Sequence, residues 1–154
     1  MVSILKVIGI LFCLTTILSC STIYPIKPCS GSENLELTNF CEINQLESGS
    51  HVSTIAYYTG FDEYWGLTSN TKCELDHEVY LNTQEMFQEK LNKKLSKIFS
   101  HLHENDWKYS LKLEITGKLE KTEEELGFGH LGQNKMQINP CQIEILERIK
   151  KSDY

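Results

Sequence analysis

The chain has 154 residues, of which 40% are hydrophobic and 23% are charged, and its formal net charge is −6 at pH 7. This length suits one domain built around a single hydrophobic core. The acidic charge argues against nucleic acid as a partner, because the long-range field of such a domain repels phosphate groups.

The first twenty residues have the layout of an export signal. Lys6 is followed by an apolar run from Val7 to Leu18, and Cys20 comes directly after the small Ser19. A run of about a dozen apolar residues is long enough for a signal peptide and shorter than the ~20 residues of a membrane-spanning helix. The tetrapeptide Ile17-Leu18-Ser19-Cys20 resembles the bacterial lipobox, whose cleavage leaves a lipid-bearing cysteine at the new N-terminus.

This resemblance implies that residues 1–19 are removed as a signal peptide and that Cys20 carries the lipid. Several acyl chains give stable anchoring, because each buried CH₂ contributes ~0.8 kcal/mol and one chain alone is marginal. We therefore expect an exported lipoprotein whose membrane partner is reached through the lipid, at the bacterial outer membrane or the periplasmic face. The alternative is cleavage near Ser19 or Ser21 without a lipid, which would give a secreted protein.

Four further cysteines follow Cys20. An even number in an exported chain indicates two disulfides, for which three connectivities are possible. A zinc site is less favoured, because no CxxC pair occurs and the compartment is oxidising. Unpaired, buried thiols are the remaining alternative. The cysteines are Cys29, Cys41, Cys73 and Cys141.

Residues 20–35 are rich in Ser, Thr, Pro and Gly, which predicts a tether between the lipid and the domain. A single domain is expected over residues 36–150. It begins with a short helix or turn between Leu35 and Leu46. Three closely spaced strands, rich in β-branched and aromatic residues, come next. They are expected at Val52–Tyr58, Phe61–Leu67 and Glu78–Leu81.

An amphipathic helix is the clearest element of the sequence. Asn82 and Glu85 have the spacing of a capping box. Apolar residues then recur at helical spacing and form one stripe, while lysines lie off it. We expect the stripe to pack on the sheet of the same domain, and the alternative is a helix that lies on a membrane surface. The stripe is Met86, Phe87, Leu91, Leu95, Ile98, Phe99 and Leu102, and the lysines are Lys90, Lys93, Lys94 and Lys97.

Two more strands follow the helix. Apolar and polar residues alternate from Trp107 to Glu120, so Trp107 and every second residue after it should face the core, with a bend at Gly117. The last strand is expected from about Met136 to Ile145. Pro140 predicts a bulge or a sheet edge within it, because proline cannot donate to a ladder. Residues 146–154 are polar and are expected to fray.

Three strands, one helix and two strands follow one another in the order of the OB fold, a small and partly open barrel. We therefore predict a mainly β (α+β) fold, a five-stranded OB-like barrel with one amphipathic helix between strands three and four. A sandwich or an open sheet fits less well, because the single helix would have too much sheet to cover.

Several short motifs lie along this order: Cys41, Gly60-Phe61, Cys73, Thr116-Gly117 and the run GFGHLG at residues 127–132. Through them, residues 41–81 and 113–143 resemble a family of small, mostly uncharacterised bacterial exported domains. The resemblance implies a barrel-like β fold and a disulfide between Cys41 and Cys73, and with it one between Cys29 and Cys141. It carries no established activity.

Catalytic patterns are missing from the sequence. HExxH, GxSxG and a phosphate-binding loop do not occur, and the neighbouring Asp62 and Glu63 would point to opposite faces of a strand. His101 and His103 lie two residues apart on the predicted helix and point apart, so surface or capping roles are expected. We thus predict a non-enzymatic binding or structural module with no catalytic residues, no metal and no cofactor.

The candidate site residues are one histidine and three aromatic residues. His130 lies between glycines, where it would either brace its turn or face a ligand. An envelope enzyme or metal-binding protein centred on His130 is the alternative function. Tyr58, Tyr64 and Trp65 are candidates for an exposed barrel face that binds an envelope protein or a small ligand.

Overall fold

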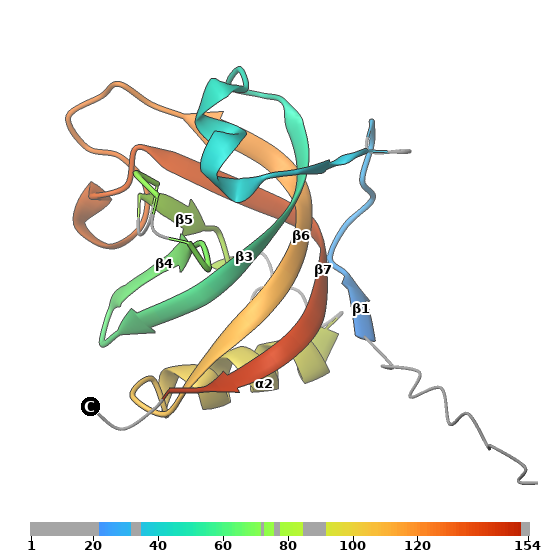
Figure 1. Cartoon of the computed structure of the whole chain (residues 1–154), viewed down its shortest axis with the longest axis vertical. Coiled ribbons are helices and arrows are strands. Elements are labelled where there is room, and N and C mark those ends of the chain that lie inside the picture. The colour runs from blue at the N-terminus through green and yellow to red at the C-terminus, as the bar shows by residue number, and fades with distance from the viewer. Residues whose placement is uncertain (1–21, 32–34, 72, 76–77, 85–91, 152–154) are drawn as a thin grey trace, which may run out of the picture.

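Figure 1 shows the computed structural model of the chain, which describes residues 22–31, 35–71, 73–75, 78–84 and 92–151. The predicted signal peptide, Cys20 and residues 85–91 of the predicted helix lie outside the described residues. The elements are β1 (Thr22–Pro25), β2 (Leu37–Thr38), η1 (Phe40–Gln45), β3 (His51–Phe61), β4 (Tyr64–Thr68), β5 (Val79–Leu81), α2 (Lys93–His103), β6 (Tyr109–Lys121), η3 (His130–Gly132) and β7 (Met136–Lys150).

Five of these strands close into a barrel. β3 pairs with β4 and β6, β4 pairs with β5, and β7 pairs with β5 and β6. All of these pairs are antiparallel except β5 with β7, whose parallel pairing is reached through the long connection that contains α2. The predicted OB-like barrel, with a helix between its third and fourth strands, is therefore confirmed.

The alternation of residue types explains which side of each strand faces inward. In β6, Leu111, Leu113, Ile115 and Leu119 are all buried, while Lys112, Glu114, Thr116 and Lys118 alternate with them and face outward. Burial of each such side chain contributes roughly 1.5–3 kcal/mol, so this one strand supplies a large part of the core. The inward side of β3 is formed by Val52, Thr54, Ala56 and Tyr58.

Trp107 does not follow the predicted alternation, because the strand begins only at Tyr109. Its side chain is 60% exposed. The backbone N–H of Lys108 donates to the Asn105 carbonyl at 2.9 Å, which keeps Trp107 in the turn after α2. The expectation that Trp107 faces the core is therefore wrong.

The β6–β7 ladder carries the bulge that Pro140 predicts. The register shifts between Thr116 and Gly117, so that Thr116 faces Gln142 and Gly117 faces Pro140, which leaves Cys141 without a partner residue in the ladder. A Cβ on Gly117 would lie 2.9 Å from the Cα of Pro140, so glycine permits the close approach of the two strands.

β7 is longer than predicted. It continues to Lys150, which pairs with Tyr109. The expectation that residues 146–154 fray is thus wrong for residues 146–150, because the start of β6 supplies ladder partners there.

Two helical segments lie at opposite ends of the barrel (Figure 1). η1 inserts the buried Phe40 and Ile43 at one end. At the other end, α2 buries Leu95, Phe99 and Leu102, which are part of the predicted apolar stripe. The stripe therefore packs on the barrel of the same chain, as expected.

Residues 22–31, which the sequence predicts as part of a tether, are held on the barrel. β1 forms an antiparallel pair with β7, from Thr22 opposite Ile145 to Pro25 opposite Gln142. A disulfide then joins Cys29 to Cys141, with 5.3 Å between their Cα atoms. The chain is thus fixed to β7 from its first described residue onward.

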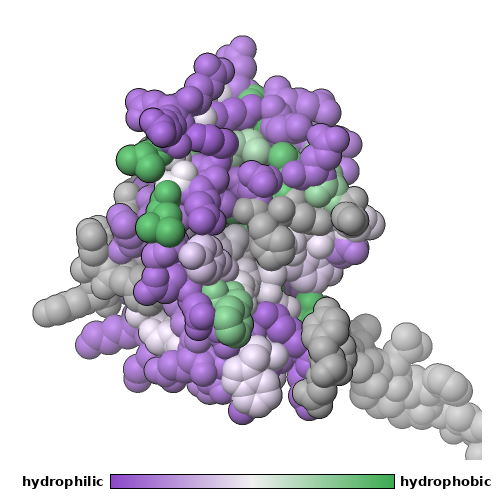
Figure 2. All heavy atoms as spheres, turned by 90° about the vertical axis from the view of Figure 1, so that its left-hand side faces the viewer, coloured by the Kyte–Doolittle hydropathy of each residue, from purple (hydrophilic) through white to green (hydrophobic). Residues whose placement is uncertain are grey.

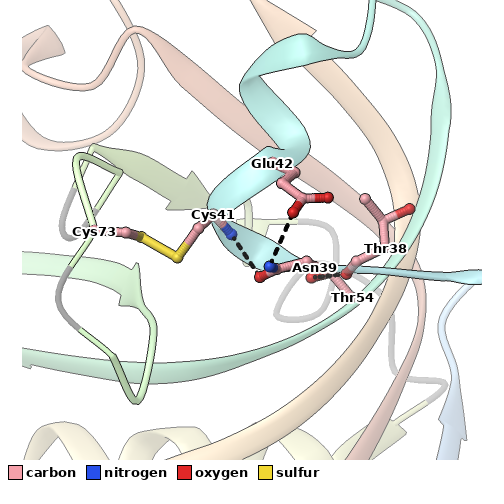
Figure 3. The surroundings of a disulfide bond; sticks show 6 residues. All are labelled: Thr38, Asn39, Cys41, Glu42, Thr54 and Cys73. Atoms are coloured by element: carbon pink, nitrogen blue, oxygen red, sulfur yellow. Dashed lines mark hydrogen bonds between the residues drawn. A yellow bond between two sulfur atoms is a disulfide. The ribbon is translucent and has the colours of Figure 1, made fainter.

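A second disulfide joins Cys41 in η1 to Cys73, with 5.9 Å between their Cα atoms (Figure 3). Asn39 caps η1, because its Oδ1 accepts the N–H of Cys41 at 3.2 Å and its Nδ2 donates to Glu42 at 3.3 Å. These two disulfides are the pairings that the resemblance implies. They indicate an oxidising, exported environment for the domain.

Candidate binding groove

A groove of about 790 Å³ runs along one flank of the barrel. It is lined by the end of β7, including Lys150, and it lies between the β3–β4 hairpin and the loop over residues 122–135 that joins β6 to β7. These are the first-to-second and fourth-to-fifth strand connections of the barrel, which in OB folds border the ligand-binding face. The side chains that matter most for its chemistry are Tyr57, Phe61, Tyr64, Trp65, His130 and Gln133.

The tip of the hairpin is held by two hydrogen bonds of Asp62. Asp62 turns the chain with a positive φ of 51°. Its carbonyl accepts the indole N–H of Trp65 at 2.7 Å, and its N–H donates to Asp106 Oδ2 at 3.0 Å. The turn therefore has a defined shape, and it presents Glu63 and Tyr64 to the groove.

The GFGHLG run forms the opposite wall as a small closed loop. Phe128 and Asn134 exchange backbone hydrogen bonds of 2.7 and 3.1 Å. Gly129 has φ +76°, and a Cβ there would lie 2.7 Å from Asn134 Oδ1 and 3.0 Å from the ring of Tyr80. Glycine is thus required at this position, and the loop places His130 at its tip, at the start of η3.

The two walls meet at His130. Its Nδ1 lies 3.2 Å from Glu63 Oε2, and its ring meets Tyr64 edge-on with 5.1 Å between centroids. The side chains of His130 and Glu63 are 32% and 73% exposed. A contact so open to solvent adds little stability, so a ligand displaces it with little loss. His130 therefore borders the groove, and its ring contacts the opposite wall through Glu63 and Tyr64.

Tyr64 and Trp65 both line the groove, but in different ways. Tyr64 is 51% exposed on the rim, whereas Trp65 is 8% exposed and belongs mainly to the core. Consecutive residues of a strand point to opposite faces, which explains this difference.

Tyr58 lies in the core and not on the barrel surface. It is 1% exposed and contacts Trp65 and Phe99 with ring centroids 5.1 Å apart in each case. Its place follows from the inward side of β3, where Val52 and Ala56 lie on the same face. The prediction that Tyr58 contributes to an exposed face is therefore wrong.

The hydroxyl of Tyr58 finds its partner in His103, at 3.1 Å from Nε2. His103 also packs against Trp65, with 4.3 Å between ring centroids. Burial lowers the pKa of the His103 imidazole, and the nearby Asp106 opposes this shift. Neutral His103 can accept a hydrogen bond from the hydroxyl of Tyr58, which keeps its proton because burial raises its pKa.

Sequence reasoning assigned His103 a surface or capping role and missed this contact. The signal was present in the helix pattern, because His103 lies four residues after Phe99 and therefore on the edge of the buried stripe. The partner hydroxyl, however, comes from β3, 45 residues away.

The surface beside the groove is mixed in polarity. Figure 2 shows that flank of the molecule as mostly hydrophilic, with separate hydrophobic spots and no continuous apolar face. Phe61 is 64% exposed and Leu131 is 66% exposed. Aromatic rings next to imidazole and amide groups suit a ligand that combines apolar faces with hydrogen-bonding groups.

Within the part of the chain that the structure describes, no three His, Cys, Asp or Glu side chains are placed to hold one metal ion. No described helix is long and apolar enough to cross a membrane. Comparisons with protein-family models, with curated proteins and with solved structures find no match to this chain.

Proposed function

We propose that this protein is a bacterial lipoprotein of the cell envelope and that it acts as a non-enzymatic binding module. In this proposal Cys20 carries the lipid, and the groove between the β3–β4 hairpin and the 122–135 loop holds the ligand. The observation that carries it is the groove itself, about 790 Å³ in volume and bordered by exposed aromatic side chains.

The ligand is expected to have both flat apolar faces and hydrogen-bonding groups. A glycan or an extended peptide segment of an envelope protein has this chemistry. Tyr64 and Phe61 would contact its apolar faces, since both are more than half exposed beside the groove. His130 and Gln133 would supply hydrogen bonds from the opposite wall.

The support for export is the pair of disulfides together with the signal-like N-terminus. The support for lipidation is the sequence Ile17-Leu18-Ser19-Cys20 alone. Mass spectrometry of the mature N-terminal peptide tests it. An acylated Cys20 is expected, and an unmodified cysteine or a start elsewhere would remove the lipid from the proposal.

Retention of envelope components tests the groove. The mature protein is immobilised and exposed to a detergent extract of the envelope from cells that produce it. The double variant Y64A/H130A should lose the bound component that the unmodified protein retains. The matched control L37A removes another exposed apolar side chain, which lies outside the groove. This variant should still retain the bound component. Equal retention by all three proteins would contradict a groove-bound ligand.

A further inference from the structure

The outer face of α2 is a cluster of positive charge on an acidic protein. The chain holds 21 acidic residues, yet Lys93–His103 contains none. Lys93, Lys94 and Lys97 are exposed, because the opposite side of α2 packs on the barrel through Leu95 and Phe99. We call the exposed side chains of Lys93, Lys94 and Lys97 the basic face.

The basic face lies beside the point where the chain enters the folded domain. Asn92 Nδ2 donates to the carbonyl of Pro25, which ties the start of α2 to β1. The ammonium group of Lys94 lies 6.0 Å from the ring centroid of Tyr24. In Figure 1, α2 runs along the end of the barrel at which β1 begins.

The lipid would enter the membrane at this same end. Only Ser21 separates Cys20 from Thr22, the first residue of β1. An extended chain covers about 3.3–3.6 Å per residue, so the Cα of Cys20 lies within about 7 Å of that of Thr22. Because β1 is paired with β7 and the Cys29–Cys141 disulfide follows it, the domain cannot move away from its anchor by releasing a long tether.

We infer that the anchored protein lies with α2 on the bilayer, its basic face against the phosphates of anionic lipids. This inference rests on the proposed lipidation of Cys20. Each lysine near an anionic surface strengthens the attraction by about fivefold. No residue of α2 lines the groove, so the basic face and the groove use different side chains.

Trp107 offers an intrinsic probe of this contact. It lies in the turn directly after α2 and is 60% exposed, with Lys108 Nζ 4.3 Å from its ring centroid. Trp65, the other tryptophan, is 8% exposed and should be shielded from lipid. Trp107 is followed by Lys108 and preceded by Glu104 and Asp106, so its surroundings carry both signs of charge.

The experiment uses the full lipoprotein, with Cys20 acylation verified by mass spectrometry, in vesicles of phosphatidylcholine with or without phosphatidylglycerol. Both vesicles contain lipids brominated near the headgroup, which quench nearby tryptophan. Two matched variants are compared: K93E/K97E reverses charge on the basic face, and K112E/K118E reverses two lysines of β6. A W107F variant measures the background from Trp65.

The inference is supported by strong quenching of Trp107 in phosphatidylglycerol vesicles. K93E/K97E should lower the fraction of protein with Trp107 in contact with lipid at least tenfold, and K112E/K118E should leave that fraction unchanged. An acylated protein whose Trp107 is not quenched would overturn the orientation and leave the lipid anchor intact. Equal loss in both variants would also overturn it, because the effect would then reflect total charge. An unacylated Cys20 would remove the anchor, and with it the orientation.

Discussion

The barrel interior and the groove rim each contain one tyrosine–histidine pair, and the two pairs have opposite roles. Inside, Tyr58 bonds to His103 at 3.1 Å and both rings pack against Trp65. On the rim, Tyr64 meets His130 edge-on, and His130 faces Glu63 at 3.2 Å. Tyr58 is 1% exposed, whereas Tyr64 is 51% exposed.

The difference shows that surroundings, and not residue type, decide the function of such a pair. A buried hydroxyl without a partner costs about 1–3 kcal/mol, so the inner pair is committed to holding α2 on the barrel. The rim pair is solvated on both sides and contributes little to stability, so its groups are available to a ligand. Trp65 joins the two regions, since it belongs to the core and borders the groove.

The largest expected effect comes from a substitution in the barrel interior. Phe99 is fully buried between α2 and the barrel and contacts Tyr58. F99A should lower the free energy of unfolding by about 3–5 kcal/mol, because it removes a packed ring and leaves a cavity. Urea titration measures this loss. F61A is the rim control, and since Phe61 is 64% exposed, a comparable loss there would contradict the distinction.

The second effect concerns the disulfide that fixes η1 beside the barrel. Cys41 and Cys73 are separated by 32 residues. The double variant C41S/C73S should have a free energy of unfolding about 3 kcal/mol lower than the unmodified protein, because its unfolded chain gains the conformational freedom of that loop. Thermal unfolding of both proteins under non-reducing conditions measures the difference. An unchanged midpoint would show that the bond adds no stability to the domain.

A smaller effect is expected from acid at the interior pair. Since burial lowers the pKa of His103 in the folded state, the unfolded chain binds the proton more readily. Stability should therefore be complete above the usual histidine pKa of about 6.5 and fall as the pH drops below it. Urea titrations at several pH values measure the free energy of unfolding. As the pH falls, this free energy should decrease less for Y58F/H103L than for the unmodified protein. Identical pH profiles would argue against His103 as the source.

The smallest stability effect is expected on the rim. E63Q removes the charge that faces His130, and exposed ion pairs contribute about 0–1 kcal/mol. Its free energy of unfolding should stay within about 0.5 kcal/mol of the unmodified protein, and retention of the envelope ligand should be unchanged, because a bound ligand displaces the Glu63–His130 contact. Chemical unfolding and the retention assay are run on the same sample. A decrease of more than 2 kcal/mol in the free energy of unfolding would contradict this, because it would show that Glu63 stabilises the fold.

The strands and their order could be predicted because their signal is local. Alternation in β6 identifies Leu111, Leu113 and Ile115 as inward residues, and Pro140 marks the bulge opposite Gly117. Trp107 continues the same alternation but lies outside the strand, since residues 104–108 form a turn that no periodic pattern records.

The groove could be predicted only in part. GFGHLG drew attention to His130, and the aromatic cluster drew attention to Tyr64. That these two meet depends on the closure of the barrel, which brings a loop and a hairpin together across more than sixty residues. The contact of His103 with Tyr58 depends in the same way on how α2 covers the barrel end.

The most direct test of the central claim places a photo-crosslinking amino acid on each region in living cells. Position 64 is on the groove rim, and position 37 is similarly exposed on β2, outside the groove. Illumination should give a discrete adduct from position 64 that H130A weakens, and no such adduct from position 37. The same adduct from both positions, or none from position 64 in cells that retain the folded protein, would contradict a binding function for the groove.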